Sequence, residues 1–166
     1  MAPLLKGVTT LCDAACAAGV PIVVVYNAFP WYSCLNVCRR WAAARGSPGA
    51  RIDPRVALPP GGATIPVAKP GASAFSSRAF SRLLAGQPPG PIRLFVAGVK
   101  AGGRGTCVRA TAADALARGH AVVVAADAVA ADSRGAREDA LNAIARRGAT
   151  VVATANEAAA MMRGTH

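Results

Sequence analysis

Residues 92–128 read IRLFVAGVKAGGRGTCVRATAADALARGHAVVVAADA, and this stretch decides the fold. Its first apolar run predicts a buried strand, a glycine-rich loop follows, and residues 107–118 have helical spacing. The next apolar run predicts a second strand that ends at Asp127. A strand, a helix and a strand in this order predict a parallel pair joined by a crossover helix.

The same alternation extends to both ends of the chain. Further helices are predicted up to Gly19 and at 76–86, 132–148 and 157–164, and further strands at 20–29, 63–69 and 149–156. The unbroken β-branched run at 20–29 is typical of a parallel strand covered on both faces, whereas Pro66 predicts an edge strand. We therefore expect one α/β domain over residues 1–166, with a doubly wound parallel sheet between two helical layers.

Composition narrows the class of protein. The chain has 166 residues, 53% of them hydrophobic, which suffices for one domain with a real core. No apolar stretch reaches the roughly 18–20 residues of a membrane span, and the first residues lack a signal-peptide pattern, so we predict a cytoplasmic protein without a membrane partner. The net charge of +11 comes from scattered arginines without a recognised nucleic-acid motif, so no nucleic-acid partner is predicted.

The five cysteines indicate reduced thiols, because their number is odd and no secretion signal precedes them. Cys12 and Cys16 share one helical face, where core filling explains them. Cys34 and Cys38 repeat that spacing, and their role stays open; core packing is favoured over a zinc site formed by all four cysteines, because structural zinc usually has more closely spaced pairs. No cluster of histidines and carboxylates has the spacing of a metal site, so neither a metal nor another cofactor is predicted.

Three segments bring polar groups to the carboxyl ends of the predicted strands, where sites of parallel α/β sheets gather. They are Lys69, the loop that leads to Cys107, and Asp127. A cysteine at a helix N-terminus meets backbone N–H groups and the positive end of the helix dipole, which favour the thiolate, and a nearby lysine acts in the same direction. Two simpler interpretations stay open: an inert buried Cys107, and a Lys69 that reaches solvent.

The residues around Cys107 and Lys69 resemble the isochorismatase-like cysteine hydrolases, a family that includes N-carbamoylsarcosine amidase, ureidoacrylate amidohydrolase and nicotinamidase. The segment LFVAGV…TCVRATAADALARGHAVVVAADA and the lysine segment VAKPGASAF carry the resemblance, in the family's order. It implies that Cys107 is the nucleophile and that Lys69 stabilises its thiolate. It also implies an oxyanion hole formed by the backbone N–H groups of Thr106 and Cys107.

The resemblance also implies where a substrate binds. The family's metal-binding members carry Asp and His after the second strand, but here the region reads YNAFPWYSC and resembles that of metal-free amidases. The substrate-binding residues expected on this basis are Asn27, Phe29, Trp31, Tyr32 and Phe75. A small-molecule substrate and a homo-oligomer, dimer or tetramer, are the partners implied.

Two features depart from the family pattern. Family members open with an apolar strand that ends in a catalytic Asp, and none of the eight carboxylates of this chain occupies that place. We therefore expect an N-terminally truncated domain without its first strand, and either a gap in the sheet between the strands at 20–29 and 92–99 or a new pairing. The loop before Cys107 is also about three residues longer than the family spacing.

Three functions follow, in descending order. The first is a cysteine-dependent hydrolase of a small linear amide or carbamoyl compound, acting through an acyl-enzyme on Cys107. The second is a catalytically impaired or truncated family member that serves as a binding or oligomer partner. The third, a basic nucleic-acid-binding protein, rests on the net charge alone.

Overall fold

The computed structural model describes residues 2–29, 44–60, 64–103 and 105–164. The helices are α1 (Ala2–Ala17), α3 (Arg78–Ala85), α4 (Cys107–Ala117), α5 (Arg134–Ala145) and α6 (Ala155–Arg163). The strands are β1 (Ile22–Asn27), β2 (Thr64–Lys69), β3 (Arg93–Phe95), β4 (Gly98–Val99), β5 (Ala121–Ala125), β6 (Val129–Ala130) and β7 (Thr150–Val152). Short 3-10 turns lie at η1 (Pro48–Ala50), η2 (Ala74–Ser76) and η3 (Ala126–Ala128). The predicted helices and strands occur in the predicted order, and two short strands, β4 and β6, occur in addition.

The strands pair in parallel, as predicted. β1 pairs with β2, β5 lies between β3 and β7, and β4 pairs with β6. Within the described residues β2 has β1 as its one neighbour, which confirms the edge position that Pro66 predicted.

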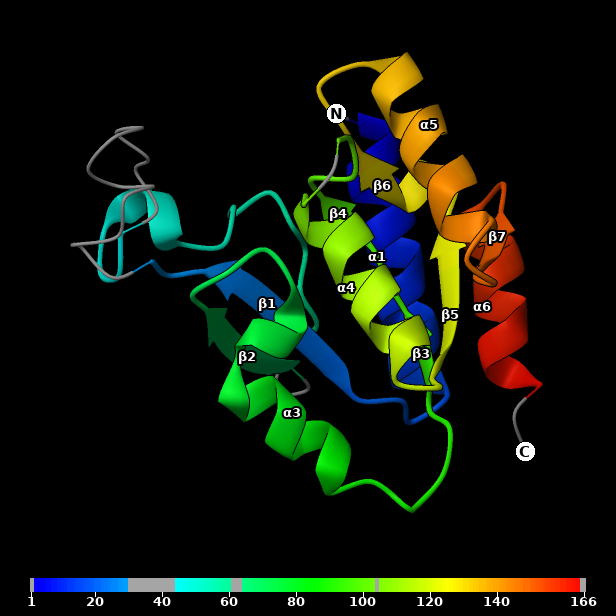
Figure 1. The fold of residues 1–166 in the computed structure, drawn as a ribbon, viewed down its shortest axis with the longest axis horizontal. Coiled ribbons are helices and arrows are strands. Elements are labelled where there is room, and N and C mark those ends of the chain that lie inside the picture. Colours follow the sequence, from blue (N-terminus) through cyan, green and yellow to red (C-terminus); the bar gives the residue numbers. More distant parts are fainter. Residues whose placement is uncertain (1, 30–43, 61–63, 104, 165–166) are drawn as a thin grey trace.

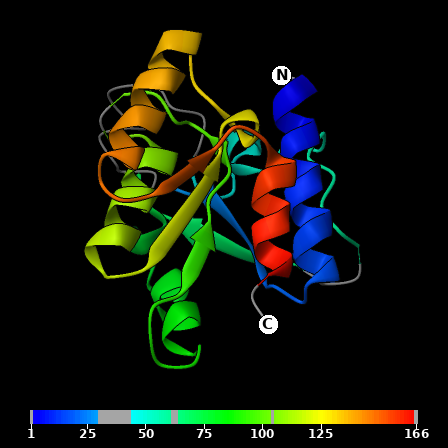
Figure 2. The ribbon, with the colours of Figure 1, turned by 90° about the vertical axis from the view of Figure 1, so that its right-hand side faces the viewer.

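Two helical layers enclose the central strand β5. Figure 2 shows α1 and α6 side by side on one face of the sheet and α4 and α5 on the other. Successive residues of a strand point to opposite faces, so Val123 and Ala125 pack with α1 and α6 while Val122 and Val124 pack with α4 and α5. This arrangement confirms the doubly wound α/β fold.

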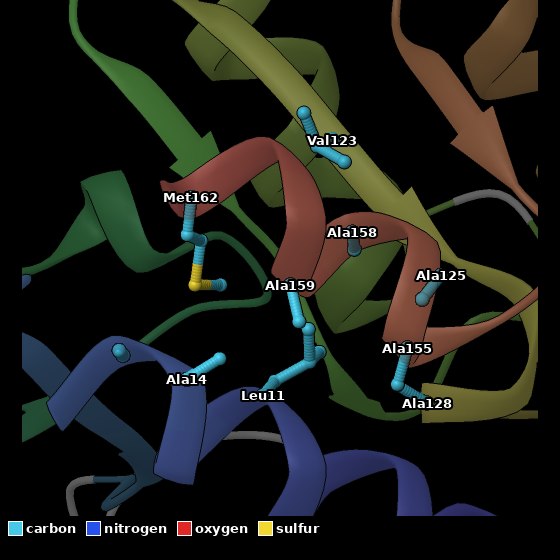
Figure 3. Packing of buried hydrophobic residues seen from close by; sticks show 10 residues of the cluster. Leu11, Ala14, Val123, Ala125, Ala128, Ala155, Ala158, Ala159 and Met162 are labelled. Carbon is cyan, nitrogen blue, oxygen red and sulfur yellow. The ribbon is translucent and has the colours of Figure 1, made fainter. Parts of the chain in front are cut away.

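Small side chains let α1 and α6 approach each other closely. Leu11 and Ala14 of α1 face Ala158, Ala159 and Met162 of α6 beneath β5 (Figure 3). All of these side chains are buried, and the cluster they form is one of the two main cores of the molecule. None of the described helices is long and apolar enough to cross a membrane.

The apolar run at 92–99 differs from the prediction of a single strand. The structure divides it into β3 and β4, which pair with β5 and β6 respectively. The division falls just before Gly98, whose φ of 111° lies in the left-handed region that a regular strand does not use. The chain thereby turns out of the β3–β5–β7 sheet before it reaches Cys107.

β1 is less covered than its sequence predicts, since each of its six residues is only half-buried. Among the described strands none joins β1 to β3, so the β1–β2 pair and the β3–β5–β7 sheet stay separate. Figure 1 shows β1, β2 and α3 beside the part of the molecule built on β5. Of the two expected outcomes, the gap is the one observed, and the exposed edge of β1 explains its partial burial.

Candidate active site

Asn27 and Lys69 meet at the carboxyl edge of the β1–β2 pair. They are the last residues of their strands and lie opposite each other in the parallel register. Register neighbours in a sheet point to the same face, so the pairing brings both side chains together. The N–H of Ala28 donates to the carbonyl of Lys69 at 3.0 Å and keeps the two strand ends together.

Lys69 is buried, with 4% of its surface exposed, which excludes the interpretation that it reaches solvent. Its Nζ donates to the carbonyl oxygens of Gly71 and Ala72, both at 2.7 Å, and to Oδ1 of Asn27. The same nitrogen lies 3.3 Å from Sγ of Cys107. The ammonium thus touches three neutral oxygens and one sulfur.

Cys107 is the first residue of α4 and follows its N-cap, Thr106. The side chain is half-buried, and its sulfur contacts two nitrogen donors: Nζ of Lys69 and, at 3.9 Å, Nδ2 of Asn27. A cysteine that only filled the core would be surrounded by apolar atoms, so these contacts favour a polar role for the thiol.

The long loop before Cys107 is held by hydrogen bonds of its own. Oγ1 of Thr106 donates to the carbonyls of Ala101 at 2.9 Å and of Gly103 at 3.2 Å. A Cβ on Gly102 would lie 2.9 Å from that of Ala131, so only glycine lets the loop approach so closely there. Among the described residues, the backbone N–H groups of Thr106 and Cys107 have no hydrogen-bond partner, as is usual in the first turn of a helix.

The segment after Lys69 is fixed against α4. Ala74 donates its backbone N–H to Oγ1 of Thr111 at 3.0 Å. Gly71 donates its N–H to Oγ of Ser76 at 3.1 Å, and that hydroxyl donates to the carbonyl of Ser73 at 2.7 Å. The two carbonyls that accept from Lys69 therefore belong to a segment anchored to the same helix that carries Cys107.

The other residues predicted to contact a substrate lie in different places. Phe29 is buried, with 2% of its surface exposed, just beyond β1. Phe75 lines a hollow of about 320 Å³ together with Arg118 and His120, and neither Lys69 nor Cys107 lines that hollow. Trp31 and Tyr32 lie outside the described residues, as do Cys34 and Cys38. A contact of these residues with substrate stays a prediction.

Carboxylates do not reach the site in the part of the chain that the structure describes. Lys69 forms no ion pair there, and the ion pairs that do form are elsewhere, such as Lys100 with Asp132. Asp127 lies in the middle of η3, and its Oδ1 is buried without a hydrogen-bond partner among the described residues. Sequence reasoning named Asn27 as a substrate contact and missed its position between the lysine and the sulfur.

The fold and the site together define a class: a doubly wound α/β protein that places a cysteine and a buried lysine at the carboxyl ends of parallel strands. The family model of the isochorismatase domain matches residues 1–156. The chain therefore belongs to the isochorismatase family, whose members are hydrolases. No curated protein matches the chain.

Solved structures share this fold. A cysteine hydrolase from Pseudomonas syringae is similar with a TM-score of 0.80 and 20% identity, over 99% of this chain and 82% of that one. N-carbamoylsarcosine amidase from Thermoplasma acidophilum has a TM-score of 0.69 and 23% identity, over 91% and 84%. Pyrazinamidase from Pyrococcus horikoshii, solved in complex with zinc, has a TM-score of 0.74 and 26% identity, over 90% and 84%.

Among the described residues, the zinc of the pyrazinamidase has no counterpart. In the ranges that the structure describes, no three histidine, cysteine, aspartate or glutamate side chains lie close enough together to hold a metal ion. Lys69, Asn27 and Cys107 offer an ammonium, an amide and one thiol, which is not a zinc ligand set.

Proposed function

We propose that the protein hydrolyses a small linear amide or carbamoyl compound, with Cys107 as the nucleophile. One observation carries the proposal: the buried ammonium of Lys69 lies 3.3 Å from Sγ of Cys107. An ammonium at this distance favours the thiolate, which is the reactive form of cysteine. The amidases among the structural neighbours support a C–N bond as the target.

The first half of the proposed reaction breaks the C–N bond. The thiolate of Cys107 donates an electron pair to the carbonyl carbon, a C–S bond forms, and the π electrons move to the oxygen. The N–H groups of Thr106 and Cys107, which have no hydrogen-bond partner among the described residues, would stabilise that oxyanion. When the intermediate collapses, the electron pair of the C–N bond leaves with the nitrogen, which takes a proton from the ammonium of Lys69.

The second half consumes one water. Its oxygen attacks the thioester carbon while the neutral amine of Lys69 accepts its proton. The C–S bond then breaks, the thiolate and the ammonium return, and a carboxylic or carbamic acid leaves. The sum is one amide and one water converted into one acid and one amine.

Turnover and adduct mass together test this proposal. Purified protein is incubated with a panel of linear amides and N-carbamoyl compounds, and released ammonia or amine is measured, with Cys107→Ser as the matched control. We expect turnover that Cys107→Ser abolishes, and an acyl adduct on the tryptic peptide 105–109 after acid quench. Release that persists in Cys107→Ser would refute the role of the cysteine.

A second candidate function has its own observation. No carboxylate contacts Lys69 or Cys107 in the described part of the chain, which supports a catalytically impaired member that acts as a binding or oligomer partner. On this proposal the panel gives no turnover, yet one of its compounds raises the melting temperature. Light scattering of the purified protein tests the predicted homo-oligomer.

A further inference from the structure

We propose that Asn27 is a positioning residue of this site. Its amide oxygen holds the ammonium of Lys69 against Sγ of Cys107, while its amide nitrogen donates toward the same sulfur. This role deepens the proposed function and rests on it. It differs from the predicted contact of Asn27 with substrate.

The chemistry of the partners fixes the orientation of the Asn27 amide. An ammonium carries only donors, so the group that faces Nζ of Lys69 must be the oxygen of Asn27. The NH₂ group then points the other way, and its nitrogen lies 3.9 Å from Sγ of Cys107. A flipped amide would set donor against donor at the lysine, so the orientation follows from the lysine itself.

The charges around Lys69 explain why an amide is needed here. Its Nζ donates to three oxygens, of Asn27, Gly71 and Ala72, and all three are neutral. A buried cation without a counter-ion is costly, and Lys69 is 4% exposed. Among its contacts in the described residues, the sulfur of Cys107 is the group that can carry a negative charge. Asn27 therefore satisfies the lysine without neutralising it and leaves its charge for the sulfur.

A carboxylate at position 27 would do the opposite. It would pair with Lys69 directly and would place a second negative charge beside Sγ, where Nδ2 of Asn27 now donates. A like charge at this range disfavours the thiolate. The contrast between Asn27→Asp and Asn27→Ala therefore separates a role in charge from a role in packing.

The experiment measures alkylation, which requires no substrate. The full chain reacts with iodoacetamide between pH 5 and 10, and mass spectrometry follows the peptide 105–109, which contains Cys107. We expect Asn27→Asp to slow this reaction at pH 7 by about tenfold or more and to move the midpoint of its pH profile upward. Asn27→Ala should slow it only about threefold, because Lys69 stays charged and buried. Asn156→Asp, the same change at an exposed residue of α6, should match the native protein.

Two outcomes overturn the proposal. One is a native rate for Asn27→Asp, and the other is an equal loss in Asn27→Asp and Asn27→Ala, which would mean that Asn27 acts only by packing. Circular dichroism checks the fold of each variant. If Asn27→Asp does not fold, the nearly isosteric Asn27→Leu replaces it in the test. A native rate of Cys107 alkylation in Asn27→Leu would then refute the proposal. Failure of the proposed function would be distinguishable from these outcomes. The amide panel would then give no turnover, while the alkylation rates of the native protein and the Asn27 variants would still differ as expected.

Discussion

Replacing Lys69 by methionine is the most direct test of the site. The change keeps the buried stem and removes the ammonium that lies 3.3 Å from Sγ of Cys107. Two unit charges at this distance interact by about 5 kcal/mol at an effective dielectric constant of about 20, which is an upper bound. Desolvation of the two ions offsets a large part of this interaction energy. We therefore expect Lys69→Met to reduce the stabilisation of the thiolate by about 1.4–2.8 kcal/mol. That loss corresponds to a roughly 10- to 100-fold slower reaction of the sulfur.

The assay is again alkylation of the Cys107 peptide at pH 7, with Lys6→Met as the matched control. Lys6 lies exposed on α1, so its loss should leave the rate unchanged. Cys12 serves as an internal reporter of folding. Its thiol is buried, and burial, together with the charge of Asp13 and with Cys16, raises its pKa, so it should react slowly in every folded variant.

The result that would refute the reasoning is a Lys69→Met variant whose Cys107 reacts at the native rate while Cys12 stays protected. Lys69 would then not activate the sulfur, whatever its distance. Faster labelling of both cysteines means instead that the variant has unfolded. In that case the comparison is between Lys69→Arg, which keeps the charge, and Lys69→Leu, both in stabilising osmolytes. Equal rates of Cys107 alkylation in these two variants would also refute the role of the charge.

Three further predictions concern the same region and one surface pair. Thr111→Val leaves the buried N–H of Ala74 without an acceptor, and we expect it to lower the free energy of unfolding in urea by about 1–3 kcal/mol. The hydrogen bonds of Arg55 lower the pKa of Asp53 to about 2, so Arg55→Ala should raise that pKa in an NMR titration. Because the folded-state pKa is depressed, any stability from this pair is present at neutral pH and disappears as the pH falls toward 2. Cys107→Asp should melt at a higher temperature than Cys107→Ser, since only the aspartate supplies an anion for the buried lysine.

Much of the fold follows from local sequence patterns. The strand–loop–helix–strand pattern at 92–128 predicts the parallel order, and Pro66 predicts the edge strand. The division of the apolar run at Gly98 was not predicted, because every residue from 94 to 99 fits a strand and only the backbone turn at the glycine separates β3 from β4. The partial burial of β1 depends on which strands lie beside it, which hydrophobicity alone does not encode.

The site was predictable to a lesser extent. Cys107 and Lys69 stand at a helix start and a strand end, which are places that a sequence pattern identifies. The role of Asn27 depends on the register of β1 against β2, which is a property of the pairing. One signal was available: IVVVYN and TIPVAK are six-residue runs that both end in a polar residue, and an aligned parallel pairing sets those two ends side by side.

The charge of Lys69 distinguishes the two candidate functions. A site retained only for binding gains nothing from an ammonium that is 4% exposed and surrounded by neutral oxygens, because such a cation costs stability. A methionine or leucine would fill the same space without that cost. The arrangement is favourable when the sulfur 3.3 Å away supplies the compensating charge, which is what the proposed nucleophilic role of Cys107 requires. The electrostatics of the buried lysine therefore favour the hydrolase over the impaired partner.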